Sequence, residues 1–433
     1  MAWALPTIAV IVLGFAAVSR LVEGTSVTAP MVFTLAGLAV GVKALDLVDT
    51  PVSGHAVKLL AEATLGVVLF SDAARIDLRT LREEYRVPAR LLGIGLPLTI
   101  AAGFAAALLV FGSLGWPEAL VLAVILAPTD AALGQTVVTL PTLPSPIRQG
   151  LNVESGLNDG LCVPVFYIAL AVASTEAGLI GLHGAVTLLV EEIGYGVLLG
   201  AAGGALAAAV VVGAGRLGSV EQSWLQVVPV AGALLAYTSA AAVGGSGFIA
   251  AFVGGMVFGG LRHRIGGEVG YLTEELGELL GAATFVVFGA TLLGPALASA
   301  TWAVAAYAVL SLTVVRMVPV AIAMIGTRAR PPTVAFLGWF GPRGLASIVF
   351  AVLLVEAEGT LPHESVILTT VFVTIGLSVL AHGVSAAPLG RRYAAWFATH
   401  PQAETLHVEA GTARHVRWRL SSRGDEGAAG APR

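Results

Sequence analysis

The chain has 433 residues, of which 57% are hydrophobic and only 12% are charged, and its mean hydropathy is +0.89. A soluble domain carries roughly one quarter charged residues, so this composition excludes an ordinary soluble protein and indicates a polytopic membrane protein. The formal net charge of −4 does not suggest a nucleic-acid partner, and the single cysteine, Cys162, excludes a disulfide framework or a cysteine-based metal site.

Apolar windows long enough to cross the hydrocarbon core, roughly 20 residues each, recur along the chain and predict about thirteen transmembrane helices. The windows lie at residues 4–19, 27–45, 57–74, 90–112, 117–139, 149–174, 190–213, 223–242, 246–261, 276–297, 301–325, 333–355 and 364–389. The fifth window contains Pro128 and the twelfth contains the run from Gly341 to Gly344, and both sequences interrupt a helix. We therefore predict an all-α polytopic membrane protein in which spans 5 and 12 are broken.

The positions of the arginines favour one orientation, because cytoplasmic loops of membrane proteins collect arginine and lysine. When the spans alternate, only Lys43 and Lys58 lie near one side, and the loop arginines lie on the other. These are Arg20, Arg75, Arg79, Arg82, Arg86, Arg90, Arg148, Arg216, Arg262, Arg264, Arg328, Arg330 and the arginines after residue 390. We expect the N-terminus outside a cell membrane and the C-terminus in the cytoplasm. Residues 1–390 then form the transmembrane domain, and residues 391–433 form a short, partly disordered cytoplasmic tail.

Acidic side chains inside two spans point to an ion path. Asp130 lies in the fifth span, and Glu154 and Asp159 lie in the sixth. A carboxylate within a membrane is costly, so it is rarely present without a partner, a cavity or a function. These three carboxylates are therefore candidate functional residues.

The spacing within the sixth span groups several oxygen-bearing side chains. Residues four apart share one face of a helix, which aligns Glu154 with Asn158 and Ser155 with Asp159. Carboxylate, hydroxyl and amide oxygens are the ligands that hard cations prefer, whereas zinc would require histidine or thiolate. We expect a site for a monovalent cation at Asp159 and no other metal.

The two broken spans suggest where such a site would lie. A proline or a glycine-rich break frees backbone carbonyls, which are tolerated at membrane depth only where they are buried or line a cavity. Interrupted helices at corresponding places in two halves of a chain are typical of inverted-repeat transporters, whose ion sites lie near the midplane. We therefore predict inverted repeats whose broken helices cross.

Four blocks of sequence, in this order, resemble the monovalent cation:proton antiporter family, the NhaP-like sodium/proton exchangers. The blocks are Thr129-Asp130, Glu154 through Asn158-Asp159, Ser246-Gly247-Phe248-Ile249-Ala250-Ala251-Phe252 and Gly341-Pro342-Arg343-Gly344-Leu345-Ala346-Ser347. The resemblance covers residues 1–390. It implies a secondary transporter of the plasma membrane that exchanges Na+, or else K+, for H+ in pH homeostasis. It also implies a homodimer in lipid that is not an enzyme and needs no cofactor.

The resemblance further implies which residues hold the ion. Asp159 is expected to bind a proton or a cation in turn, with Thr129 and Ser155 as additional cation ligands. Asp72 matches an acidic position in the third span that contributes to the site. Asn158, before the aspartate, goes with electroneutral one-for-one exchange in this family.

Other charged residues are expected to support the site. By the resemblance, Glu154 forms a buried ion pair with Arg316, which gives two otherwise costly membrane charges each other as partners. We expect this pair to be structural. Asp130 and Arg343 are expected to face the ends of the broken helices and to offset their dipoles.

Competition for one carboxylate explains how such a site would exchange ions. A proton and a cation cannot both neutralise Asp159, and either one lowers the cost of moving the site through a low-dielectric barrier. Alternating access to the two sides then yields obligatory exchange. The cation competes only where Asp159 is largely deprotonated, so activity should depend on pH.

Two alternatives belong to other functional classes. Gly244-Gly245-Ser246-Gly247 fits the short serine signature of rhomboid-like intramembrane proteases, and His382 lies in a later span where a general base could sit. This hypothesis leaves Asp130, Glu154 and Asp159 unexplained. The second alternative is a cation channel that does not exchange ions, which would be recognised by currents far above transporter turnover.

Overall fold

The computed structural model describes residues 4–22, 25–41, 45, 55–75, 85–130, 133, 142–176, 181–218, 221–262, 270–357 and 361–400. Its helices are α1 (Ala4–Val22), α2 (Ala29–Val40), α3 (His55–Arg75), α5 (Arg86–Arg90), η1 (Leu91–Gly95), α6 (Leu96–Val110), α7 (Trp116–Ile125), α9 (Ser145–Glu176), α10 (Leu182–Leu217), α11 (Gln222–Ala242), α12 (Gly247–Arg262), α13 (Tyr271–Val287), η2 (Phe288–Leu293), α14 (Gly294–Ser299), α15 (Trp302–Leu312), α16 (Val314–Ala323), α17 (Pro331–Trp339), α18 (Leu345–Glu356) and α19 (Glu364–Thr399). Every apolar window of the sequence contains one or more of them.

Within these described ranges, eight helices are long and apolar enough to cross a membrane by length and composition. Shorter apolar helices, α2, α7, α12 and α18, accompany them. The all-helical fold class is as the sequence predicts. The number of membrane crossings, the repeat symmetry and the orientation stay predictions.

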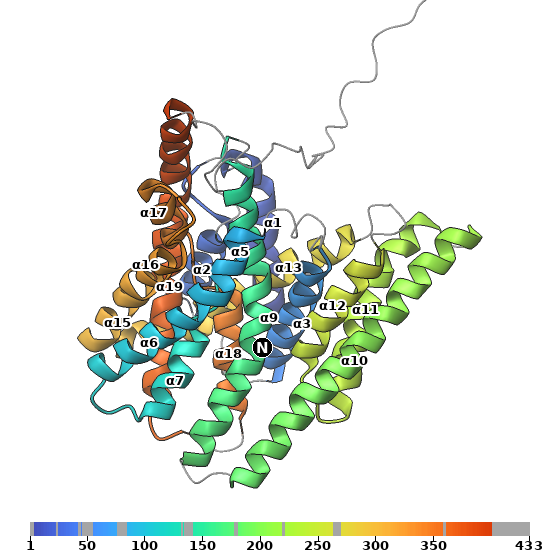
Figure 1. Ribbon diagram of the computed structural model, residues 1–433, viewed down its shortest axis with the longest axis horizontal. Helices are drawn as coiled ribbons and strands as arrows, with labels where there is room; N and C mark the ends of the chain where they lie inside the picture. Colours follow the sequence, from blue (N-terminus) through green and yellow to red (C-terminus); the bar gives the residue numbers. More distant parts are fainter. Residues whose placement is uncertain are drawn as a thin grey trace, which may run out of the picture.

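The helices form two groups on either side of α9 (Figure 1). α10, α11 and α12 pack against one another at one edge, and α15, α16 and α17 lie at the opposite edge. α9 contacts α7 and α5 on one side, and α3, α10 and α12 on the other. The central helix therefore touches both groups, and the polar residues of the sixth predicted span lie on it.

Glycines allow α10 and α12 to pack with their backbones almost in contact. A Cβ placed on Gly200 would overlap the backbone of Ala250, and one placed on Gly204 would overlap that of Gly254. Small residues permit such close approach between membrane helices, where apolar burial alone gives little driving force.

Both predicted breaks involve non-helical backbone. α17 ends at Trp339 and α18 begins at Leu345, so residues 340–344 separate two short helices. α7 ends at Ile125 and leads into a non-helical segment through Asp130. Residues 131–132 and 134–141, the greater part of the rest of the fifth predicted span, lie outside the described residues. The two segments meet where the Asp130 backbone amide donates to the Pro342 carbonyl at 2.8 Å.

α19 continues beyond the boundary predicted at residue 390. It runs to Thr399 because its last turns pack on α17: the Tyr393 ring stacks on Phe336 with centroids 4.3 Å apart, and its hydroxyl lies 2.9 Å from Thr333 Oγ1. Residues 401–433, most of the expected tail, lie outside the described residues.

A buried carboxylate ties the start of α7 to the start of α19. Glu118 accepts a hydrogen bond from the Gly115 amide at 3.0 Å and one from the His363 amide at 2.8 Å. The His363 ring nitrogen Nδ1 lies 2.9 Å from the same carboxylate, whose side chain is only 8% exposed. One side chain therefore fixes the turn before α7 and the N-cap of α19.

We expect Glu118→Ala to destabilise the fold by about 1–3 kcal/mol, because it leaves two amides without an acceptor. Thermal unfolding in detergent measures this loss. The matched control is Glu356→Ala, which removes the Lys58–Glu356 ion pair, whose side chains are 33% and 26% exposed. Such an exposed pair contributes at most about 1 kcal/mol. Equal melting temperatures for the two variants would contradict the expectation.

Candidate ion-binding site

Two turns of α9 carry the polar group that the spacing predicted. Glu154, Ser155, Asn158 and Asp159 lie within the helix, and all four are buried. Apolar residues follow on the same helix, with Val163 and Phe166 fully buried. The helix therefore holds its polar side chains in one short stretch and packs the next turns in the apolar core.

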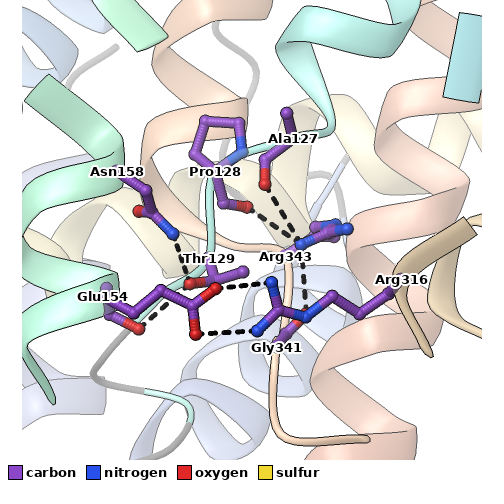
Figure 2. Close-up of polar contacts among 9 residues, drawn as sticks. Ala127, Pro128, Thr129, Glu154, Asn158, Arg316, Gly341 and Arg343 are labelled. Atoms are coloured by element: carbon purple, nitrogen blue, oxygen red, sulfur yellow. Dashed lines mark hydrogen bonds and ion pairs between the residues drawn. The ribbon is translucent and has the colours of Figure 1, made fainter. Parts of the chain in front are cut away.

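Thr129 from the segment after α7 meets this polar stretch (Figure 2). The Asn158 amide nitrogen Nδ2 donates to Thr129 Oγ1 at 2.6 Å, and that hydroxyl lies 3.1 Å from Ser155 Oγ. Asn158 Oδ1 and Asp159 Oδ1 are buried and have no hydrogen-bond partner within the described part of the chain. Buried polar oxygens rarely lack partners, so these two oxygens are candidate ligands for an ion.

Glu154 and Arg316 form a two-fold ion pair between α9 and α16, as Figure 2 shows. Arg316 Nη1 donates to Glu154 Oε1 at 2.5 Å, and Nη2 donates to Oε2 at 2.8 Å. Each side chain is only 2% exposed. The parallel geometry engages both carboxylate oxygens, and the Arg316 charge neutralises Glu154.

Arg343 faces the end of α7. Its Nη1 donates to the carbonyls of Ala127 and Pro128 at 3.3 and 3.4 Å, and to the carbonyl of Gly341 at 3.2 Å (Figure 2). These carbonyls have left the helical pattern, and a buried cation beside them offsets the negative end of the helix dipole. Arg343 thus lies where the helix break leaves carbonyls in need of a donor.

Asp130 faces the start of α18. Its Oδ2 accepts a hydrogen bond from the Leu345 backbone amide at 2.7 Å, at the positive end of that helix. Ser347 on the first turn of α18 donates to the Ile125 carbonyl at 2.7 Å, and so joins the two helix ends directly. Asp130 therefore lies at the start of α18, and Arg343 lies at the end of α7.

Glycines let these charged groups come close to the backbone. A Cβ on Gly341 would overlap the Arg316 guanidinium, and a Cβ on Gly344 would overlap the Asp130 carboxyl. The Gly-Pro-Arg-Gly run therefore does more than break a helix, because its glycines leave room for the Arg316 and Asp130 side chains.

Asp72 on α3 lies beside α9 at Gly156, one turn before Asp159 on that helix. A Cβ placed on Gly156 would be 3.4 Å from the Asp72 Cβ, so the two helices touch there. Asp72 Oδ1 also lies 3.9 Å from Arg75 Nη1, and Arg75 Nε donates to Glu274 at 2.6 Å. The structure thus brings Asp72 next to the polar stretch, although in the described residues it does not join the hydrogen bonds around Thr129.

An aromatic ring lies on the residue that follows Asp159. Phe252 of α12 lies directly on Gly160, where a Cβ would overlap the ring. Phe252 ends the Ser246–Phe252 block, so that block packs on α9 beside the carboxylate. Sequence reasoning did not find this contact, although a glycine directly after an intramembrane aspartate is a signal of close helix approach.

The two residues of the protease hypothesis have separate structural roles. Ser246 Oγ accepts from the Ile249 amide at 3.3 Å at the start of α12. His382 on α19 contacts Ser378 and the Trp339 carbonyl. No hydrogen bond joins Ser246 to His382 among the described residues, so the arrangement does not support a nucleophile and its base.

Comparison with known proteins identifies the family. Residues 8–392 match the family model described as sodium/hydrogen exchanger, transmembrane. The chain belongs to this family. The match confirms the resemblance that the four sequence blocks predicted, and it indicates a transporter.

Two relatives of the chain are named for the cations that they exchange. The chain is 28% identical over 352 residues to the Na+/H+ antiporter NhaP of Pseudomonas aeruginosa, covering 76% of this chain and 79% of that protein. It is 23% identical over 338 residues to the K+/H+ antiporter NhaP2 of Shewanella oneidensis, covering 77% of this chain and 57% of that protein. The chain thus spans little more than half the length of NhaP2.

A solved structure has the same fold. The sodium proton antiporter MjNhaP1 of Methanocaldococcus jannaschii superposes with a TM-score of 0.73 at 18% identity, covering 89% of this chain and 98% of that chain. The exchanger fold therefore extends over nearly the whole of the described chain.

We expect Glu154→Ala to destabilise the protein by about 3–5 kcal/mol, because it leaves the Arg316 charge buried and uncompensated. Replacing both residues with methionine should recover most of the loss, since no buried charge remains. Thermal unfolding in detergent measures all three proteins. A double variant no more stable than Glu154→Ala would contradict the structural role of the pair.

Proposed function

We propose that this protein exchanges a monovalent cation for a proton across the cell membrane, with Asp159 as the shared binding carboxylate. One observation carries the proposal. The buried oxygens Asp159 Oδ1 and Asn158 Oδ1 have no hydrogen-bond partner among the described residues, and they lie in the same two turns of α9 as Ser155, which contacts Thr129. Free oxygens beside a buried carboxylate suit a hard cation, and a proton suits the same carboxylate.

The exchange follows from the charge of the site. With Asp159 ionised and empty, the site carries a charge that is costly to move through the low-dielectric core. Either a proton or a cation removes that cost, but both cannot bind at once. Alternating exposure of the loaded site to the two sides then couples the fluxes in opposite directions.

The remaining residues take graded roles in this proposal. Thr129 and Ser155 supply hydroxyl ligands, and Asp72, which lies against Gly156 of α9, adds a carboxylate on the side of α3. Asn158 holds Thr129 in place through its amide nitrogen and carries no charge of its own. Asp72 lies 3.9 Å from Arg75, whereas Asp159 Oδ1 has no hydrogen-bond partner among the described residues, so a single exchanging carboxylate, Asp159, favours electroneutral one-for-one exchange.

Na+ is the first ion to test and K+ the second, because P. aeruginosa NhaP and MjNhaP1 carry sodium in their names and the Shewanella relatives carry potassium. We place the protein in the plasma membrane with the N-terminus outside. Residues 1–390 are then the exchanger domain, and residues 391–433 are a cytoplasmic tail. We further propose a homodimer embedded in lipid that has no enzymatic activity, no cofactor and no nucleic-acid partner.

Reconstituted protein tests the function directly. Liposomes containing a pH-sensitive dye receive Na+ and then K+, and wild type should move protons on addition of at least one ion. Asp159→Asn should abolish the signal, because the amide can bind neither a proton nor a cation with a compensating charge. The matched control, Glu191→Gln on the exposed face of α10, should exchange like wild type.

Two outcomes would overturn the proposal. Folded wild type that responds to neither ion is not an exchanger of this type. Currents far above transporter turnover, with no coupled proton movement, would identify a channel. An exchange rate that is the same with and without clamping the membrane voltage to zero supports electroneutral exchange, because electrogenic exchange would run faster under the clamp.

Competition predicts how the exchange depends on pH. As pH falls, protons occupy Asp159 more often, so the apparent KM for the cation should rise in proportion to proton concentration while Vmax stays constant. Initial rates over a matrix of pH and cation concentration measure both constants. A fall in Vmax at constant KM would instead indicate a separate titrating group.

A further inference from the structure

His382 lies at the helix break but outside the ion-binding group. It is fully buried on α19. Its Nε2 is 2.9 Å from the Trp339 carbonyl, so that nitrogen must donate. Its Nδ1 is 3.2 Å from Ser378 Oγ and 3.0 Å from the Ser378 carbonyl. A neutral imidazole that donates from Nε2 has no proton on Nδ1, so Nδ1 accepts from the Ser378 hydroxyl, and both ring nitrogens have partners in the protein.

These partners hold both ends of the break between α17 and α18. Trp339 is the last residue of α17. Ser378 Oγ accepts from the Arg343 backbone amide at 2.7 Å, two residues before α18 begins. Ser378 and His382 are four residues apart, so one face of a continuous helix reaches both sides of the interruption.

Pro342 restricts the backbone of the break at one position, and the two glycines of the segment depend on contacts from outside it. Two of residues 340–344 are glycines, which have no side chain to restrict the backbone. Within the segment, the Gly341 amide bonds only to Trp339, at 2.9 Å. α19, a helix of 36 residues, is the rigid element beside it.

The position of this segment carries through to Thr129. The Pro342 carbonyl accepts from the Asp130 amide at 2.8 Å, next in sequence to Thr129. On the other side of Thr129, the Pro128 carbonyl accepts from Arg343 Nη1. A displaced break would therefore move the backbone on both sides of a hydroxyl in the ion-binding group.

We propose that His382 is a positioning residue for cation binding, which holds the α17–α18 break through Trp339 and Ser378 and so fixes Thr129. This inference rests on the proposed exchange function. His382 does not carry the transported proton, because its ring nitrogens are committed to the break. Its loss should weaken cation affinity and leave the turnover of the loaded carrier intact.

Three variants separate this role from its rivals. His382→Ala removes both contacts. His382→Gln keeps an amide N–H that can reach the Trp339 carbonyl. Ser385→Ala is the matched control. Ser385 lies on α19 one turn after His382, and it accepts from the Trp339 side chain, through Nε1, at 2.8 Å and not from the backbone of the break.

Exchange in liposomes measures KM, Vmax and their pH profile for each variant. For His382→Ala we expect the cation KM to rise about tenfold, the effect of losing roughly one net buried hydrogen bond. Vmax should stay within about twofold of wild type, since binding alone is affected. His382→Gln should restore KM with a wild-type pH profile, and Ser385→Ala should leave both constants unchanged.

Other results would overturn the proposal. Equal increases in KM for Ser385→Ala and His382→Ala would indicate general packing. Loss of proton transport in His382→Gln would indicate a proton carrier. If His382→Ala does not fold, His382→Asn takes its place, since the shorter asparagine side chain can reach Ser378 but not the Trp339 carbonyl. The proposal would then be overturned if His382→Asn and His382→Gln had the same KM for the cation.

A second measurement does not depend on transport. Amide hydrogen exchange over residues 340–344 should accelerate in His382→Ala and stay unchanged in Ser385→Ala. Unchanged protection in His382→Ala would overturn the positioning role even if wild type transported nothing. Faster amide hydrogen exchange in His382→Ala, together with wild type that transports no cation, would support the positioning role of His382 and reject the proposed function.

Discussion

Interrupted helices inside a membrane must satisfy their own broken ends, and the rest of this structure depends on how that is done. At the crossing, carbonyls after α7 and amides at the start of α18 are removed from water and have no helical partners. Arg343 donates to the first group, and Asp130 accepts from the second. Each charge reaches across to the other interrupted helix, so each break supplies a partner for backbone groups that the other leaves without one.

The buried carboxylates near the two helix breaks differ in whether their oxygens have fixed partners. Glu154 uses both oxygens on Arg316, and Asp130 caps α18. Asp159 keeps an oxygen with no hydrogen-bond partner within the described residues, one turn along the same helix. Similar side chains in similar burial thus have different chemistry, because a carboxylate is available to an ion only when the fold has not already neutralised it.

The sequence predicted the parts of the site that local rules determine. The four-residue spacing put Glu154 and Asn158 on one face, and the Gly-Pro-Arg-Gly run predicted a break, because both follow from single-helix geometry. The Glu154–Arg316 pair came instead from resemblance, since 162 residues separate the partners. Contacts that depend on packing between distant helices were not predicted. Phe252 lies on Gly160, and α19 lies beside the α17–α18 break, where His382 contacts Trp339 instead of acting as a general base. The same packing of α19 on α17 carries the helix past the expected boundary at residue 390.

The charge balance of the proposed site favours the exchange of one cation for one proton. Glu154 and Arg316 cancel each other, and so do Asp130 and Arg343, each placed against a helix pole of opposite sign. Asp72 lies 3.9 Å from Arg75, so in the proposed mechanism the charge that exchanges belongs to Asp159, and one proton or one monovalent cation neutralises it. Both loaded forms then cross the low-dielectric barrier without net charge, while the empty form does not. An acid in place of the neighbouring asparagine would leave one loaded form charged, so we propose that the Asn158 amide keeps one-for-one exchange electrically silent.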